Sequence, residues 1–281
     1  MNRTKFQGLI CPIDTKPLQL DGKLLCCETG HCFDIAKQGY VNLLPVQNKK
    51  SLSPGDSKAM VEARNRFLNS GIYQPVLSKL CTQIEALALP AGARVLDAGC
   101  GEGYYTKKLA EYFPHLQFIG QDISKEALKL ASKKEERIDW LVASNSQPPI
   151  APASIDLILC IFGFHSFAGF SQVLSPDGKI ILVDPGTEHL IELRELVYQQ
   201  VNKRPAYSIA DAEQYKLSLL KEQALHFNTE TLNHEQIQDL LLMTPHLFRA
   251  SKEGKVKAEG LTQIELSIDM LFRTLGGQAD V

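Results

Sequence analysis

The segment VLDAGCGEG at residues 95–103 constrains the fold of this 281-residue chain more than any other. A buried strand pattern runs directly into a turn that carries Gly99, Gly101 and Gly103, and a helical pattern follows. Glycine lets the backbone turn sharply and approach a ligand without a Cβ atom in the way. In open α/β sheets, ligands bind beyond the carboxyl ends of strands. The segment therefore predicts a ligand-binding α/β domain.

Strand and helix patterns alternate from Arg94 onward. Five short apolar segments indicate buried strands: RVLDAGC, QFIGQDI, IDWLVAS, IDLILCIFG and GKIILVDPG. Two helical patterns lie among them, YYTKKLAEYF and SKEALKLASKK. This alternation predicts a parallel sheet with helices on both faces. The tail departs from it, because EQALHFNTETL and TQIELSIDMLFRTL indicate two more strands around a helix at HEQIQDLLLM.

The spacing of the glycines argues against a dinucleotide site. Such a site requires GxGxxG, and here Tyr104 stands at the sixth position. Asp97 precedes the first glycine by two residues, where a carboxylate repels a pyrophosphate and favours a cationic ligand. S-adenosylmethionine (SAM) has a sulfonium and an ammonium group and no phosphate. The pattern VLDxGxGxG resembles motif I of class I methyltransferases, which implies their Rossmann-like, mostly parallel seven-stranded sheet with one late antiparallel strand.

Polar side chains follow three further strands. Asp122 ends the second strand, where an acid accepts hydrogen bonds from ribose hydroxyls, although it would also complement the next helix N-terminus. Ser144 and Asn145 follow the third strand and are candidates for reading the adenine edge. His165 follows the fourth strand, where methyltransferases usually place groups that face the substrate. It is a weak catalytic candidate, because a lone histidine is more often structural.

The N-terminal region has the composition of a metal-binding module. Four of the seven cysteines lie in the first 46 residues. The two motifs are CPID and CCETGHC, which contain Cys11, Asp14, Cys26, Cys27, His31 and Cys32. A cysteine in place of Asp14 would complete a four-ligand zinc pattern. So short a segment buries too little surface to fold alone, so we expect either a metal or packing on the larger domain to stabilise it.

Composition divides the chain into a basic front and an acidic body. Residues 1–70 carry ten Lys and Arg against six Asp and Glu, which leaves −6 for the rest because the net charge is −2. A basic front suits docking on phosphate, although a mildly basic solvated surface gives the same count. We expect a docking module at 1–46, a linker and helical lead-in at 47–90 and the catalytic domain at 91–281.

Nothing in the sequence predicts membrane insertion or export. The apolar run at 157–164 is too short to cross a bilayer, and residues 1–14 lack a continuous apolar signal segment. An odd number of cysteines favours a reducing compartment. We therefore expect a cytoplasmic protein.

Several longer segments narrow the resemblance. FDIAKQGYVNLLPVQNKK, PGDS, ARNRFLNSGIYQP, LDAGCGEGYYT, HLIEL and LLLMTPH together resemble the bacterial 23S rRNA guanine-N1 methyltransferases, in order from Cys11 to about Arg249. The resemblance implies SAM-dependent methylation of N1 of a guanine in a domain II hairpin of 23S rRNA. It also implies an N-terminal module that grips the RNA, and a homodimer.

The resemblance adds site residues that pattern analysis misses. It places Tyr73 and His189 at the cofactor pocket, although core packing and a helix start would otherwise explain them. Together with the residues selected from the pattern, the expected cofactor set is Tyr73, Asp97, Gly99, Gly101, Glu102, Gly103, Asp122, Asn145 and His189. The family's zinc ligands fall on Cys11, Asp14, Cys27 and His31, with Cys26 or Cys32 as a substitute for the missing thiolate.

One segment departs from the family. CIFGFHSF replaces the usual Arg-Ile-Tyr-Ala-Pro run after the fourth strand. Two alternatives therefore stay open at this point. One is a methyltransferase acting on another RNA or on a small molecule. The other is a non-catalytic RNA-binding or ribosome-assembly factor, against which the intact glycine loop and Asp122 argue.

Overall fold

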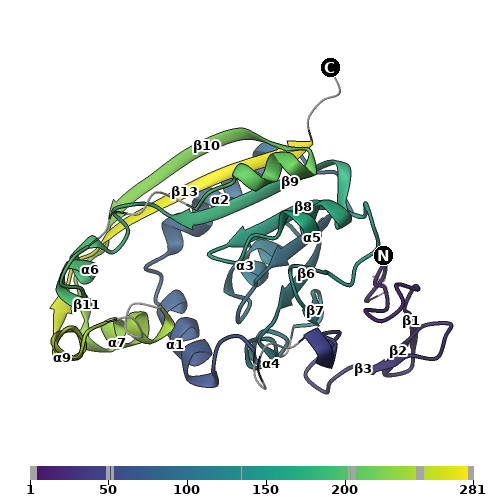
Figure 1. The fold of residues 1–281 in the computed structure, drawn as a ribbon, viewed down its shortest axis with the longest axis horizontal. Coiled ribbons are helices and arrows are strands. Elements are labelled where there is room, and N and C mark those ends of the chain that lie inside the picture. The colour runs from purple at the N-terminus through teal and green to yellow at the C-terminus, as the bar shows by residue number, and fades with distance from the viewer. Residues whose placement is uncertain are drawn as a thin grey trace.

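The computed structural model describes residues 5–48, 51, 54–133, 135–201, 203, 207–244 and 250–277. These residues form an eight-stranded sheet in the order β10-β13-β9-β8-β5-β6-β7-β4 (Figure 1). The six strands from β9 to β4 run parallel, and β13 is antiparallel to both of its neighbours. The strands are β4 (Tyr40–Asn42), β5 (Arg94–Ala98), β6 (Gln117–Asp122), β7 (Asp139–Val142), β8 (Ile155–Ile161), β9 (Leu174–Pro185), β10 (Leu217–Asn228) and β13 (Ser267–Gly277).

The inserted antiparallel strand confirms the expected class I topology. The sheet differs from the seven-stranded prediction by one edge strand, β4, which pairs with β7 so that Tyr40 lies opposite Trp140. Tyr40 and Val41 are buried on the two sides of the sheet, so this edge is closed by apolar packing. The sequence indicated only an extended segment here, because three residues carry no information about a partner 100 positions away.

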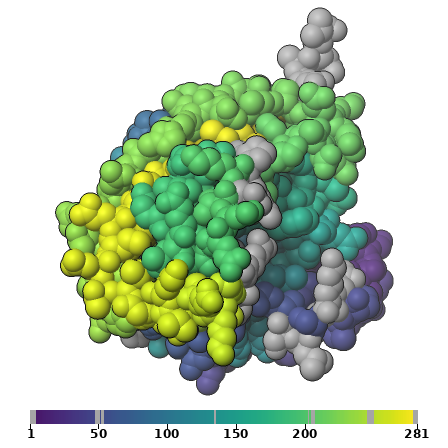
Figure 2. Space-filling view, turned by 60° about the vertical axis from the view of Figure 1, so that its left-hand side comes forward, coloured from purple at the N-terminus to yellow at the C-terminus, as the bar shows by residue number. Residues whose placement is uncertain are grey.

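Helices cover both faces of the sheet. They are α1 (Lys58–Asn69), α2 (Gln74–Ala86), α3 (Tyr104–Tyr112), α4 (Lys125–Ala131), α5 (Phe167–Val173), α6 (Ile191–Val197), α7 (His234–Met243) and α9 (Lys252–Glu259). One hydrophobic core contains residues of the four helices α1, α2, α3 and α4, among them Phe67, Leu80 and Leu109. The other core joins Phe170 of α5 to Leu9 and Leu25 of the N-terminal region. The helices α6 (green) and α9 (yellow), with the segments around them, form one flank of the molecule (Figure 2).

Helix starts follow the expected capping residues. The Ser124 hydroxyl accepts a hydrogen bond from the Ala127 amide, and the Ser57 hydroxyl accepts one from Met60. Asn233 forms a capping box with Gln236 at the start of α7. Gly103 is the N-terminal cap of α3, so the glycine loop leads directly into a helix.

The N-terminal region packs on the sheet rather than standing apart from it. Its own antiparallel sheet consists of β1 (Gln19–Asp21), β2 (Leu24–Cys26) and β3 (Cys32–Asp34). The Ala151 amide donates to the Gly8 carbonyl at 2.8 Å, and Arg94 donates to the Gln7 carbonyl at 2.8 Å. These contacts fix the region against one end of the parallel strands.

Short elements complete the described chain. They are the 3-10 helices η1 (Val46–Asn48) and η2 (Ala210–Tyr215) and a two-stranded sheet of β11 (Leu232–Asn233) and β12 (Gln263–Ile264). Parts of the predicted linker, at 49–50 and 52–53, and the end of LLLMTPH with the stretch up to Arg249, at 245–249, lie outside the described residues. None of the described helices has the length and apolar character that a bilayer crossing needs.

Candidate functional site

The glycine loop lies between β5 and α3, and each glycine has its own structural reason. Gly99, Gly101 and Gly103 have φ angles of +98°, +56° and +81°, a region that side chains with a Cβ rarely adopt. A Cβ at Gly103 would lie 2.6 Å from the Trp140 ring, so this glycine allows α3 to pack closely on the sheet. At Gly101 the nearest atom would be the Arg64 guanidinium, 3.6 Å away. The first two glycines therefore shape the loop, and the third serves packing.

The side chain of Asp97 lies in an environment that is unusual for a carboxylate. It is 1% exposed, and it accepts a hydrogen bond from the Thr106 hydroxyl. Its other oxygen, Oδ1, has no hydrogen-bond partner among the described residues. Burial raises the pKa of Asp97 to about 7. The hydrogen bond from Thr106 acts against this shift, and the nearby charges of Asp122 and Glu102 add to it. A buried acceptor without a donor is a place where a ligand gains affinity by supplying one.

Glu102 is a second buried acid in the same loop. It is 3% exposed, and burial raises its pKa to about 7, although the Arg64 guanidinium 4.0 Å away acts against this. Arg64 itself lies 2.5 Å from Asp56 and donates to the Met243 carbonyl. Arg64 thus joins α1, the segment before it and α7 to the glycine loop.

Asp122 is held by backbone donors at the end of β6. Its Oδ2 accepts from the Gly101 amide at 3.0 Å, and its Oδ1 accepts from the Ser124 amide at 2.7 Å. Burial raises its pKa above the ordinary range. Together with Asp97 and Glu102, Asp122 concentrates carboxyl groups at this loop. These hydrogen-bond acceptors fit a ligand with cationic groups and hydroxyls, as SAM has, and disfavour a phosphate.

Tyr73 and His189 meet across the same site. The Tyr73 hydroxyl lies 3.4 Å from Nε2 of His189, and the Asp269 amide donates to His189 Nδ1 at 3.5 Å. The Tyr73 ring also packs edge-on against Phe67 and lies 6.2 Å from the Phe162 ring. Burial raises the pKa of Tyr73, so its hydroxyl stays protonated and can donate. The structure therefore brings together two residues that only the family resemblance had selected.

The Asn145 side chain makes two hydrogen bonds within the protein. Its Oδ1 accepts from Gln121 at 3.0 Å, and its Nδ2 donates to the Phe164 carbonyl at 3.1 Å. These bonds use the amide to tie the loop after β8 to β6. Adenine recognition by this side chain stays a prediction, and it would have to use the remaining lone pair or proton.

His165 lies in a buried charged cluster. Its Nε2 is 3.0 Å from Oδ1 of Asp184, whose other oxygen accepts from Arg273 at 2.5 Å. Asp184 is 1% exposed, and Arg273 also donates to the Tyr207 carbonyl. The cluster stands at the carboxyl end of β9, beside the loop after β8. The contact between His165 and Asp184 is an ion pair only when the imidazole is protonated, because Nε2 makes no hydrogen bond among the described residues.

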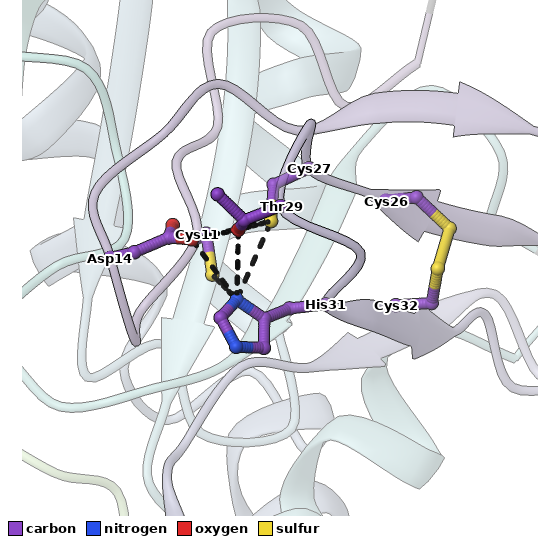
Figure 3. Close-up of a disulfide and its surroundings, with 7 residues drawn as sticks. All are labelled: Cys11, Asp14, Cys26, Cys27, Thr29, His31 and Cys32. Carbon is purple, nitrogen blue, oxygen red and sulfur yellow. Dashed lines mark hydrogen bonds and ion pairs between the residues drawn. A yellow bond between two sulfur atoms is a disulfide. The ribbon is translucent and has the colours of Figure 1, made fainter.

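The second site lies in the N-terminal region (Figure 3). His31 Nδ1 is 3.0 Å from Oδ2 of Asp14, 3.6 Å from Sγ of Cys11 and 3.5 Å from Sγ of Cys27. All four ligand atoms lie within 4.8 Å of one another. Zinc bonds of about 2.0–2.3 Å in a tetrahedron separate ligand atoms by roughly 3.3–3.8 Å. Two thiols, an imidazole and a carboxylate at these distances fit zinc.

Thr29 adds a polar contact to the cluster. Its hydroxyl lies 3.0 Å from Cys27 Sγ and donates to Asp14. Burial acts to raise the pKa of the Cys27 thiol, but hydrogen bonds from Thr29 and His31 outweigh it and bring the pKa to about 7. A thiol of this kind readily becomes the thiolate that binds a metal.

Cys26 and Cys32 do not join the cluster. They form a disulfide across β2 and β3, where they occupy opposed positions of the register. Neighbouring residues of a strand point to opposite faces, so Cys27 faces the cluster and Cys26 faces away from it, as Figure 3 shows. With their sulfurs joined, neither supplies the substitute thiolate that the sequence left open. The disulfide also differs from the reduced cysteines expected for a reducing compartment.

Sequence reasoning missed three residues of these sites. Arg64 lies within the segment ARNRFL, whose helical pattern predicted only a core-facing helix. Asp184 follows the fifth strand at its carboxyl end, and that position was a usable signal. Arg273 comes from β13, and only the antiparallel insertion beside β9 brings it to Asp184.

Comparisons with known proteins match both regions of the chain. The N-terminal family model of RlmA, a zinc ribbon, matches residues 9–52, and a methyltransferase domain model matches residues 95–178. The Bacillus subtilis protein YxjB is 29% identical over 96% of this chain and 98% of its own length. It carries the name of a 23S rRNA (guanine-N1)-methyltransferase as a provisional assignment. A Micromonospora griseorubida protein with the same provisional name is 34% identical over 66% of this chain and 68% of its own.

A third relative is matched over nearly its whole length. The 23S rRNA (guanine(748)-N1)-methyltransferase of Streptomyces fradiae is 30% identical over 98% of this chain and 92% of its own. A ubiquinone/menaquinone biosynthesis C-methyltransferase of Syntrophotalea carbinolica, by contrast, matches only 54% of this chain. Given the near full-length match and the zinc-ribbon match at the N-terminus, this chain belongs to the 23S rRNA (guanine-N1)-methyltransferase family.

Proposed function

We propose that this protein transfers the methyl group of SAM to N1 of a guanine in a domain II hairpin of 23S rRNA. The observation that carries the proposal is the acidic glycine loop, with Asp97, Glu102 and Asp122 beside the Tyr73–His189 pair, in a chain that matches these enzymes over nearly its full length. SAM supplies an electrophilic methyl group on a sulfonium. Asp97 and Glu102 complement its positive charge, and Asp122 accepts hydrogen bonds from its ribose.

The chain's own residues then position the guanine and remove its proton. The N1 lone pair forms the new C–N bond as the C–S bond breaks, and the electron pair of the C–S bond stays on sulfur. Holding the two reactants in line accounts for much of the acceleration. The N1 proton must leave, and His165, whose Nε2 lies 3.0 Å from Asp184, is the proposed acceptor through its other ring nitrogen. Because N1 lies on the Watson–Crick edge, the guanine must be unpaired or flipped out.

The N-terminal region is the proposed docking module. Cys11, Asp14, Cys27 and His31 would hold a structural zinc ion, which fixes the loops around β1, β2 and β3. Residues 1–46 would grip the RNA by shape and phosphate, with 47–90 as lead-in and 91–281 as the methyltransferase domain. The homodimer expected from the family stays a prediction, and sedimentation of the purified protein tests it.

Mass spectrometry of rRNA tests the function in the cell. Nucleosides from 23S rRNA of a strain lacking the gene should lose N1-methylguanosine, and the wild-type gene should restore it. A gene with Asp97→Asn and Asp122→Asn should not restore it. Retention of the modified nucleoside in the deletion strain would overturn the proposal.

A further inference from the structure

Three of the large exposed aromatic side chains on the described part of the chain lie in or beside one loop. The aromatic residues with large exposed fractions are Tyr112, Phe162, Phe164, Tyr207 and Tyr215. Phe162 and Phe164 lie in the loop directly after β8, and the Tyr207 ring lies 6.1 Å from that of His165 in the same loop. Phe164 is 72% exposed, the largest fraction in this group. The loop lies where a substrate would meet the cofactor.

The loop that carries these rings is fixed to the cofactor loop. The Phe162 amide donates to Val183 at 2.9 Å, and the Phe164 carbonyl accepts from Asn145 at 3.1 Å. A Cβ added to Gly163 would lie 3.0 Å from the Ala98 carbonyl and 2.8 Å from Cys160 Sγ, so the two loops are in close contact. The position of Phe164 relative to the glycine loop is therefore set by backbone and side-chain contacts on both sides.

The backbone of the loop after β8 turns at Phe162. Its φ of +55° is unfavourable for a bulky residue, and such conformations concentrate at functional sites. Its ring packs toward Tyr73, at 6.2 Å between centroids. The turn at Phe162 thus directs its own ring toward Tyr73 and leaves the ring of Phe164 exposed.

The charges around the loop determine which part of a nucleotide it can accept. Asp97 and Asp122 are acidic groups at the carboxyl ends of the adjacent strands β5 and β6, and they disfavour a phosphate here, whereas Asp184 is paired with Arg273. A guanine that leaves its helix loses its stacking partners and regains part of that energy on an aromatic face. We propose that Phe164 stacks on the flipped-out target guanine and positions it against the cofactor. This inference rests on the proposed function.

The test combines variants of the protein with variants of the RNA. Wild-type protein, SAM and a 23S hairpin transcript first locate the methylated guanine by mass spectrometry. Phe164→Ala should raise the KM for the hairpin about 10- to 100-fold, as expected for the loss of one base–aromatic stack, with SAM affinity unchanged. Phe164→Leu should lose as much, because it restores bulk but not the aromatic face, and Phe164→Trp should retain wild-type KM. Tyr112→Ala, which removes an exposed ring at the far end of α3, is the matched control.

A binding cycle isolates the stack from catalysis. Replacing the target guanine by an abasic site should weaken binding of the wild-type protein and leave binding of Phe164→Ala almost unchanged. Equal losses in both proteins would overturn the stacking inference while leaving the proposed function intact. If the wild-type protein methylates no RNA, the proposed function fails and the inference fails with it.

Discussion

The hydroxyl of Tyr73 lies 3.4 Å from Nε2 of His189, although 116 positions separate the two residues in the chain. Tyr73 precedes α2, and His189 follows β9, so the contact joins the helical lead-in to the far side of the parallel sheet. The pair closes one wall beside the glycine loop. Core packing alone would be a purely structural role for this pair, and the first prediction separates that role from cofactor binding.

Removing only the hydroxyl should affect the cofactor and not the fold. Tyr73→Phe keeps the ring contact with Phe67, so its free energy of unfolding should change by less than about 1.5 kcal/mol. Its affinity for SAM should fall about 3- to 10-fold, measured by titration calorimetry. Tyr73→Ala should also lose about 3–5 kcal/mol of stability. Unchanged SAM affinity in Tyr73→Phe would place the residue in the core only.

Cofactor affinity should depend on pH through the buried acids. Burial raises the pKa values of Asp97 and Glu102 to about 7 in the ligand-free protein. A cationic ligand stabilises the ionised carboxylates and lowers these pKa values, so binding releases protons. SAM affinity should therefore rise from about pH 5 to pH 7 and then level off. Calorimetry in buffers of different ionisation enthalpy should show the proton release, and Glu102→Gln should reduce it. A flat pH profile would contradict the assignment.

Ionisation of the buried Asp97 carboxyl should lower the stability of the folded protein at neutral pH. Because the pKa of Asp97 is raised in the folded state, that state binds more protons than the unfolded state between about pH 4 and 7. Stability of the ligand-free protein should fall as the pH rises through this window. Asp97→Asn should remove this component and stabilise the protein at pH 8 by a few kcal/mol, on the order of 4 for a pKa moved from 3.8 to about 7. Urea unfolding at both pH values measures it, and a destabilised Asp97→Asn at pH 8 is the contrary outcome.

Two arginines of α1 form a matched pair. Arg64 lies between Asp56 and Glu102 with its side chain 24% exposed, whereas Arg66 bonds Asp239 with its side chain 60% exposed. Arg64→Gln leaves the buried Glu102 carboxyl without its neighbouring cation and should cost about 3 kcal/mol. Arg66→Gln should cost at most about 1 kcal/mol. Chemical denaturation compares them, and equal costs would show that Arg64 does not hold the glycine loop.

The metal centre predicts a stoichiometry and a ligand set. Protein purified without chelator should contain one zinc per chain by mass spectrometry, and His31→Ala should lose it. Asp14→Cys should bind zinc more tightly, because thiolates suit structural sites. Cys26→Ser with Cys32→Ser should keep the metal, since their sulfurs point away from the cluster. Loss of zinc in that double variant would show that one of these thiols is a ligand.

The sequence predicted the parallel sheet and its glycine loop because both depend on local patterns. Strand periodicity, Gly99 to Gly103 and the acid after the second strand all lie within one continuous segment. Residues that meet across the sheet were not predictable in this way. Arg273 reaches Asp184 only through the antiparallel insertion of β13, and β4 joins the sheet through a partner 100 residues away. Tyr73 and His189 became visible only through resemblance, since a buried tyrosine alone predicts packing.

The central claim is best tested by methyl transfer in a purified system. The protein, SAM labelled in its methyl group and a transcript of 23S rRNA domain II should give label in one guanine, recovered by nuclease digestion and mass spectrometry as N1-methylguanosine. Protein carrying Asp97→Asn and Asp122→Asn should transfer none. Label at another base position, or no transfer to RNA by protein that binds SAM, would contradict the account.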